Sequence, residues 1–478
     1  MPYPFVLPTT SHLSFQQNFT SSTHPSLPSA ATSQRELLRS VLKQHKRLPV
    51  ASQGSNLNEV LTAVTSYLKY ICTLDKGLSG SLVNDEDIDL ALTKEVEVEW
   101  RPTLSSSVIP GREVERLRGR GLDYEYYFSH QTYAVVQNLL ARQALLGLYT
   151  ATVPSSEQRL SLVQTATKHM KTACSIHASL VQRANTSDGP PELPPQAVDV
   201  SVTIQSALQR VAQAEFNILS AFKDDPYPAI LVQARNELDR EWMIKAPEIP
   251  KARAQVLTRL FVGAAEHAAG AAATLKAEKR VSRELIEYVE DLRRTARARA
   301  CRFQAIDADV CGETGKGLAW IYAGLNELGL EIEIKAGNGK TSGLSKLKAS
   351  WNERKEDKKI GKGSSRWGSD AGKAEEARIL EYLEKRLCKS NDNVHFQKIP
   401  EYKPLLGMLP TGMNMPLGDE KWKPPLLTED ELVLMRAPPE RDDMDKNSSG
   451  DEDQFDVNSQ GPAGAFPGTH AEYKESYY

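Results

Sequence analysis

The residues that most suggest chemistry lie in the run Leu330-Glu-Ile-Glu-Ile-Lys-Ala-Gly-Asn-Gly-Lys-Thr341. A strand-like stretch before Gly-Lys-Thr is typical of a phosphate-binding loop, in which backbone N–H groups surround the phosphates and the lysine neutralises them. The complete motif needs a glycine five positions before Gly339, where Ile334 stands, and a basic, glycine-rich stretch follows instead of a helix. A flexible loop is the better interpretation, and we expect Lys340 to bind no ATP or GTP.

Histidine and cysteine, which often bind metals or act as nucleophiles, are scattered along the chain. None of the nine histidines has a second histidine four positions away beside an acidic residue, and the five cysteines form no Cys-x-x-Cys pair. No nucleophile-elbow pattern marks a serine for catalysis. His177 stands on an apolar stripe of a predicted helix, where a packed core residue is more frequent than a ligand. We therefore expect no metal site, no cofactor and no enzyme activity.

Charged residues are balanced over the whole chain, with 59 Lys and Arg against 62 Asp and Glu, so we expect no nucleic-acid partner. Their distribution is uneven, because residues 336–373 carry ten basic and four acidic side chains while residues 437–478 carry three basic and ten acidic. This composition predicts a basic flexible insertion over 336–370 and an acidic disordered tail over 437–478. The lysines of the insertion that we expect to face anionic lipid are Lys346, Lys348, Lys355, Lys358 and Lys359.

A second basic group lies on one predicted helix and consists of Arg293, Arg294, Arg297 and Arg299. A solvated helix face is the usual reason for such a cluster. A site for acidic lipid or phosphate is the alternative. The sequence leaves both interpretations open.

The chain shows neither a secretion signal nor a membrane span. Its first residues, MPYPFVLPTTSHLSF, lack a basic leader, and no apolar run approaches the ~18–20 residues that a bilayer requires. An odd number of dispersed cysteines fits reduced intracellular thiols. We expect a cytoplasmic protein.

Periodicity predicts a mainly helical fold with a small N-terminal β-sheet. Residues 1–30 indicate an extended segment, and the alternation in Glu95–Trp100 predicts a half-buried strand that Pro102 ends. The N-terminal segment is the only other plausible strand, so we expect the two to pair. The predicted helices are 33–45, 58–71, a run from Ser129, one after Pro154 capped by Ser155 or Ser156, then 197–222, 229–245, 251–278, 280–308, 314–328 and 371–388.

The helix after Pro154 has apolar or small side chains on two faces. One stripe runs from Leu160 to Val181 in steps of three and four, and another runs from Leu162 to Leu180. Such a helix packs between two neighbours, as in bundles and helical solenoids. The small residues from Gly263 to Ala273 likewise predict close packing between helices.

Three stretches together resemble the BRO-domain family of ALIX-like proteins: residues 129–184, AQAEFNILSAF at 212–222 and NDNVHFQKIP at 391–400. The opening residues Phe5–Phe15 and the strand ending at Trp100 are also similar. The resemblance implies an elongated, boomerang-shaped domain over residues 3–425 with a tetratricopeptide-like helical core. Val394 and His395 occupy the positions of an Ile-Tyr pair in the family, so we carry over no role for a phosphorylated tyrosine there.

Nothing similar to the V-shaped domain or long proline-rich tail of ALIX-like proteins follows this region. That layout resembles the family members that act in fungal pH signalling. It implies a non-catalytic adaptor in ambient alkaline pH signal transduction, which binds an ESCRT-III core subunit and helps to assemble the pH-signalling protease complex. The adaptor would be recruited peripherally to endosomal or plasma-membrane ESCRT sites, where it could contact other pH-signalling components. The alternatives are a helical scaffold with a different partner in endosomal trafficking, and a nucleotide-dependent enzyme.

Tyr227-Pro-Ala-Ile230 is similar to the short peptides that V-shaped domains recognise. Here it stands between two predicted helices, and Pro226 or Pro228 suits the first turn of the second. We expect it to be folded in rather than presented as an extended peptide.

The resemblance also implies a binding surface. In ALIX-like domains the C-terminal amphipathic helix of the ESCRT-III subunit lies across an apolar patch. Ile230 and Ala234 are one helical turn apart, so both can face one groove, although each could equally be ordinary core. The residues at the matching positions are Ile218, Ile230, Leu231, Ala234, Leu409 and Met413.

Overall fold

The computed structural model describes residues 2–106, 113–149, 155–186, 193–228, 249–330, 368–418 and 422–438. Residues 1–436 form one compact unit and residues 437–478 a second. The predicted insertion up to residue 367 and the tail beyond residue 438 lie outside the described residues, as does the predicted helix 229–245.

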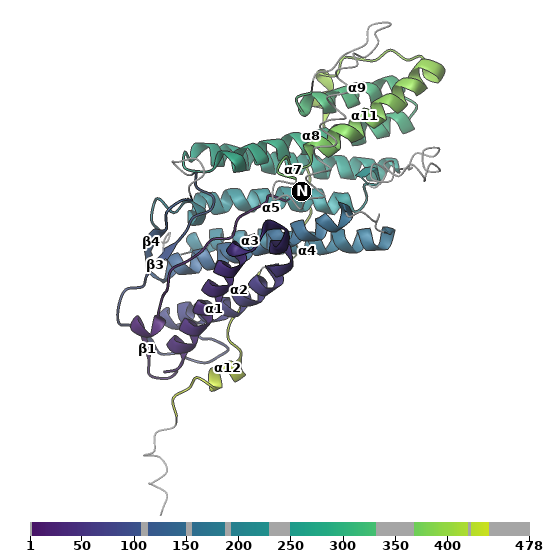
Figure 1. The fold of residues 1–478 in the computed structure, drawn as a ribbon. Helices are drawn as coiled ribbons and strands as arrows, with labels where there is room; N and C mark the ends of the chain where they lie inside the picture. The colour runs from purple at the N-terminus through teal and green to yellow at the C-terminus, as the bar shows by residue number, and fades with distance from the viewer. Residues whose placement is uncertain are drawn as a thin grey trace, which may run out of the picture. The chain divides into compact units, whose positions relative to one another are not determined.

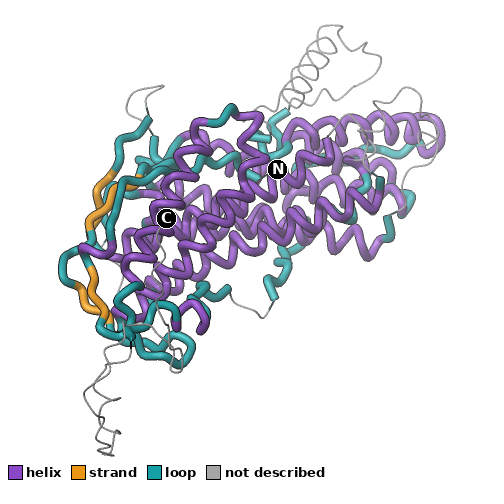
Figure 2. The backbone as a smooth tube through the Cα atoms, turned by 60° about the horizontal axis from the view of Figure 1, so that its bottom comes forward, coloured by secondary structure: helices purple, strands orange, loops and turns teal. Residues whose placement is uncertain are grey.

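The prediction of a mainly helical fold is confirmed (Figure 1). Along the chain, each long helix packs against the next, from α1 and α2 through α3, α4, α5, α7 and α8 to α9 and α11. Figure 2 shows these helices side by side, with the strands along one edge of the array. The long helices are α1 Leu27–Arg47, α2 Val50–Leu78, α3 Leu122–Leu146, α4 Ser156–Ala184, α5 Val202–Phe222, α7 Lys251–Ala277, α8 Arg283–Val310, α9 Thr314–Glu327 and α11 Lys373–Ser390. The shorter ones are the 3-10 turns Phe15–Gln17, Gly147–Tyr149, Val198–Val200 and Pro404–Met408, a π turn Asn391–His395 and α12 Glu429–Val433.

Helix α4 shows how the local sequence sets an element. Ser155 caps it, since the Ser155 Oγ accepts from the Gln158 backbone N–H at 3.2 Å and the Gln158 Oε1 accepts from the Ser155 N–H at 3.0 Å. Its two apolar stripes pack between α3 and α5, as predicted. His177 is buried there, with its Nδ1 2.7 Å from the Gln205 Oε1, so the core interpretation of this histidine is confirmed.

Two small antiparallel sheets lie at the N-terminal side, and the predicted strand pairing was partly wrong. Strand β3, Glu97–Trp100, pairs mainly with β4, Leu117–Arg120. The N-terminal segment adds only a bridge from Thr10 to Trp100. Two further strands, β1 Phe19–Ser21 and β2 Leu90–Leu92, pair with each other. The strand β4 was missed because its sequence, Leu-Arg-Gly-Arg, has almost no strand-forming character.

A buried ionic cluster joins the end of α5 to α8 and α11. The Arg302 guanidinium donates to Asp225 at 2.6 Å and to Glu376 at 2.7 Å, and all three side chains are fully or almost fully buried. Arg299 adds a second contact to Glu376 at 3.2 Å. These contacts fix the position of α11, from whose end the chain turns back across the array.

The described chain after α11 crosses the helices in reverse order. We call residues 391–436 the returning segment. In turn it contacts α9, α7, α5, α3 and α2, so it runs along the helical array and joins helices that are far apart in sequence. The contacts are Gly315 N–H to Gln397 Oε1 at 2.9 Å, Met413 N–H to Arg259 O at 2.9 Å, Met415 N–H to Asn217 Oδ1 at 3.0 Å, the rings of Trp422 and His130 at 5.4 Å, and Leu427 N–H to Thr73 Oγ1 at 3.3 Å.

None of the helices in the described ranges is both long and apolar enough to cross a bilayer.

Candidate partner-binding surface

Residues 409–415, which we call the strap, lie over α5 and α7. The Met413 N–H donates to the Arg259 backbone oxygen at 2.9 Å, which anchors the strap on α7. The Met415 N–H donates to the Asn217 Oδ1 at 3.0 Å, and the Gln213 Nε2 donates to the Met415 oxygen at 3.3 Å, which anchors it on α5. An extended segment must find partners for its backbone groups outside itself, and the helices supply them here.

Two glycines let the strap approach α7 closely. A Cβ atom on Gly263 would overlap the backbone oxygen of Met413 and lie 3.0 Å from its nitrogen. A Cβ atom on Gly412 would lie 2.7 Å from the Gly263 Cα. The small residues of α7 were predicted to serve helix packing, which Ala264 and Ala268 do by being buried in the core. Gly263 has a different role, because the lack of a Cβ atom there lets the strap backbone approach α7.

Buried amides on α5 mark the same place. Asn217 is 0% exposed, donates from its Nδ2 to the Asn414 Oδ1 at 3.3 Å, and accepts at its own Oδ1 from the Gln213 Nε2 at 3.0 Å. The His267 Nε2 on α7 lies 2.8 Å from the same Asn414 oxygen. Sequence analysis missed these residues. Their signal is a pair of amides, Gln213 and Asn217, one turn apart in the part of α5, residues 211–222, that is buried throughout.

The structure describes three of the six residues of the predicted patch. Leu409 and Met413 lie on the strap, half-buried and packed against the main core. Ile218, next to Asn217 on α5, is only 5% exposed and belongs to that core. Ile230, Leu231 and Ala234 lie outside the described residues.

The predicted basic sites have different outcomes. The lysines of the insertion, Lys346, Lys348, Lys355, Lys358 and Lys359, and the Gly-Lys-Thr at Lys340, lie outside the described residues. On α8, Arg297 pairs with Glu327 at 3.0 Å, and the buried Arg299 pairs with Glu376. Arg293 pairs with Glu290 at 3.2 Å. These three arginines thus have acidic partners, which favours a structural role for the cluster over an anion site.

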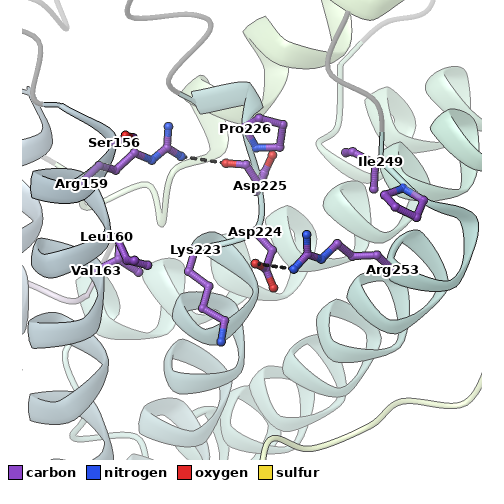
Figure 3. A pocket seen from close by; sticks show the side chains of 11 residues that line it. Ser156, Arg159, Leu160, Val163, Lys223, Asp224, Asp225, Pro226, Ile249 and Arg253 are labelled. Atoms are coloured by element: carbon purple, nitrogen blue, oxygen red, sulfur yellow. Dashed lines mark hydrogen bonds and ion pairs between the residues drawn. The ribbon is translucent and has the colours of Figure 1, made fainter.

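A pocket of about 370 Å³ opens where the start of α4, the end of α5 and the start of α7 meet (Figure 3). Arg253 pairs with Asp224 at 3.1 Å, and the Arg159 Nη2 donates to the Asp225 backbone oxygen at 2.7 Å. Burial lowers the pKa of Arg159, with nearby Asp225 opposing the effect. Lys223 also lines the pocket. The pocket has room for a small anion, but both arginines already have partners.

Tyr227 lies beside this region and is 1% exposed. The Tyr227 N–H donates to the Asp225 Oδ1 at 3.1 Å. As predicted, the Tyr-Pro-x-Ile sequence is folded in at its tyrosine, since a buried ring cannot be offered to a peptide-binding domain.

Metal binding finds no support in the described part of the chain. No three His, Cys, Asp or Glu side chains within it are grouped so as to hold a metal ion. The five cysteines are free, and burial raises the pKa of Cys72 and Cys301, which keeps these thiols protonated and unreactive.

Comparison with known proteins identifies the family. No family model matches the chain. The chain is 40% identical over 505 residues to the pH-response regulator protein palC of Emericella nidulans, with 98% of this chain and 99% of that protein covered. This chain belongs to the palC family of pH-response regulators.

Solved structures share the fold of this palC family member. The structure of an ALIX BRO1 CHMP4C complex matches with a TM-score of 0.51 and 14% identity, over 90% of this chain and 96% of that one. ALIX in complex with the SIVmac239 PYKEVTEDL late domain matches with a TM-score of 0.50 and 13% identity, over 89% and 49%. The predicted BRO-domain fold is thus confirmed. As a pH-response regulator with a BRO-domain fold, the chain is a regulatory protein and not an enzyme.

Proposed function

We propose that this chain is an adaptor in ambient alkaline pH signalling, which binds the C-terminal amphipathic helix of an ESCRT-III core subunit at the strap. Membership of the palC family supports the signalling role. A solved BRO1 domain of the same fold was captured with CHMP4C, which supports an ESCRT-III partner. The observation that supports the site is the strap, because Leu409 and Met413 are half-buried on it and Met413 is anchored on α7.

The strap suits a helical partner for physical reasons. A helix laid on a groove gains affinity from a few apolar anchors that become fully buried on binding, and a polar rim sets its register. Leu409 and Met413 still have surface to bury, and methionine adapts to differently shaped partners. In our proposal Ile230, Leu231 and Ala234 complete the patch from the predicted helix 229–245. Ile218 would add almost no exposed surface to the patch, since its side chain is already buried.

Recruitment to membranes is the wider part of the proposal. We infer that the adaptor helps to assemble the pH-signalling protease complex at endosomal or plasma-membrane ESCRT sites. The basic insertion 336–370 would assist, at about 1 kcal/mol for each Lys or Arg near an anionic surface. Deleting it should weaken sedimentation with anionic liposomes, and unchanged sedimentation would remove the insertion from the proposal.

A pull-down with purified ESCRT-III core subunit tests the function. We expect the full chain to retain the intact subunit and to lose a form without the C-terminal helix. Ile230→Asp should abolish retention while the melting temperature stays unchanged, whereas unfolding would show that Ile230 is core. Failure to retain the intact subunit would favour the alternative, a helical scaffold in endosomal trafficking with a different partner.

A further inference from the structure

The chain leaves α11 through a turn that exposes apolar side chains. The π turn Asn391–His395 is followed by Phe396, whose φ of 52° lies in the left-handed region. Phe396 is 75% exposed and Val394 67% exposed, and Ile399 follows at 36%. We call residues 391–399 the clamped turn.

Hydrogen bonds hold the backbone of this turn in one conformation. The Phe396 N–H donates to the Asn391 backbone oxygen at 2.7 Å. The Asn391 side chain accepts from the Gln397 N–H at 3.0 Å and donates to the Gln397 oxygen at 2.9 Å. The exposed apolar side chains are therefore carried by a fixed backbone.

The Gln397 side chain ties the turn to the junction of α8 and α9. Its Oε1 accepts from the Gly315 N–H at 2.9 Å, and its Nε2 donates to the Gly312 oxygen at 2.7 Å. A Cβ atom on Gly315 would lie 2.6 Å from the Lys398 oxygen, so the backbones are in close contact here too. In Figure 1, α9 and α11 lie at one end of the helical array, and the turn follows α11 there.

Phe396 is an unfavourable residue for its position on two counts. The left-handed conformation suits glycine or asparagine and is uncommon for a bulky side chain. An aromatic ring left in water also contributes little to folding. Strained residues that the surrounding structure holds in place cluster at functional sites, and the strain here points to a use for the ring outside the folded chain.

Unpaired positive charge flanks the ring. Lys385 and Lys389 precede the turn on α11, and Lys398 and Lys403 lie in and after it. All four are exposed, and none has an acidic partner among the described residues. Residues 385–403 hold five Lys and Arg against two Asp and Glu, which favours an anionic counterpart.

We propose that the clamped turn is a membrane-insertion site, in which Phe396 and Val394 enter the interfacial region of an anionic bilayer and the flanking lysines contact the headgroups. A stable protein interface buries roughly 800 Å² on each partner, far more than three side chains on one turn provide. A bilayer accepts a protruding aromatic ring without a complementary shape, and basic residues beside apolar ones are typical of interfacial binding. This proposal does not rest on the ESCRT-III proposal, because no strap residue takes part in it.

Sedimentation of the full chain with phospholipid vesicles tests it. The vesicles are either phosphatidylcholine alone or an equimolar mixture with phosphatidylserine. We expect partition onto the mixed vesicles, with weak binding to phosphatidylcholine alone. Phe396→Asp should reduce the partition coefficient roughly tenfold, because the variant has no aromatic ring to bury in the bilayer. Phe396→Trp should preserve it, and Leu434→Asp, at an 83% exposed position outside the turn, should leave it unchanged.

Phe396→Gly is the control for misfolding of Phe396→Asp, because glycine suits the left-handed backbone and keeps the turn intact. It should sediment as weakly as Phe396→Asp. The proposal would be overturned if wild type, Phe396→Asp and Phe396→Gly had equal partition coefficients. It would also be overturned if the wild-type chain did not sediment with the mixed vesicles. Loss of a protein partner in Phe396→Asp, with vesicle binding unchanged, would instead make the turn a protein-binding site.

Discussion

The strap and the clamped turn belong to the same returning segment, yet their apolar side chains differ in exposure. In both, a helix glycine lets the backbone approach: Gly263 under the strap and Gly315 under the turn. In both, side-chain amides complete the backbone hydrogen bonds. Met413 on the strap is half-buried, however, whereas Phe396 on the turn is 75% exposed.

The difference shows that fixing a backbone and burying its side chains are separate matters. The strap's side chains already stabilise the fold and offer only part of their surface to a partner. Those of the turn contribute little to the fold and offer nearly all of theirs. Substitutions on the strap should therefore change stability and binding together, and substitutions on the turn should change them separately.

The largest effect should come from the ionic cluster that positions α11, and with it both regions. Arg302→Leu leaves Asp225 and Glu376 buried without their main partner, which should lower the free energy of unfolding by about 3–5 kcal/mol. Urea denaturation measures this. Arg283→Leu, which removes an exposed pair with Glu287 on the same helix, is the control and should cost less than about 1 kcal/mol. Similar losses for both variants would contradict a structural role for the cluster.

A pH-dependent effect of similar size should come from Glu215 on α5, whose carboxylate contacts Asn138 and Tyr288. Burial raises the pKa of Glu215 to about 7 from its usual 4.5, with the Tyr288 hydroxyl, at 2.5 Å, opposing the shift. The folded state then binds a proton that the unfolded state has released, so stability falls as pH rises from about 4.5 through about 7.

Glu215→Gln should remove this loss, because glutamine does not titrate. Relative to wild type, its free energy of unfolding should increase by roughly 2–3 kcal/mol between about pH 5 and pH 8. Burial also raises the pKa of Asp199, to about 6, but both proteins share that residue and its effect cancels. Parallel stability curves for the two proteins would show that Glu215 is ionised throughout.

The strap itself can be displaced through Gly263. In Gly263→Ala the new methyl group overlaps the Met413 oxygen, and the strain should cost about 2 kcal/mol of stability although alanine favours the helix. Partner binding should weaken as well. Gly407→Ala is the matched control in the same segment, since nothing lies within 4 Å of its Cβ. If Gly263→Ala is as stable as Gly407→Ala, the strap does not lie on α7 as described.

The smallest effect should be a gain in stability at the turn. Phe396→Gly relieves the left-handed backbone and should raise the free energy of unfolding by about 1 kcal/mol, offset in part by the flexibility of glycine in the unfolded chain. Thermal denaturation measures it. A clear loss of stability would mean that the ring packs against the fold, and the comparison between turn and strap would fail.

The helices could be predicted because their periodicity is a local property. The ranges 251–278 and 314–328 differ from α7 and α9 by a single residue at an end. The strand β4 could not be predicted, since Leu117–Arg120 owes its conformation to pairing with β3. Resemblance indicated Leu409 and Met413 as partner-binding residues, and that role stays a prediction. The role of Gly263 could not be predicted, because it depends on a contact between residues 150 positions apart, which no local pattern records.

The central claim is that a helical ESCRT-III segment binds at the strap, and calorimetric titration of the full chain with that amphipathic helix tests it most directly. Two matched variants of the returning segment, Met413→Asp on the strap and Met408→Asp at a position 65% exposed outside it, separate the site from the rest of the surface. We expect Met413→Asp to lose roughly 2 kcal/mol or more of binding free energy and Met408→Asp to bind like wild type. Equal affinity of wild type and Met413→Asp, with both folded, would contradict it.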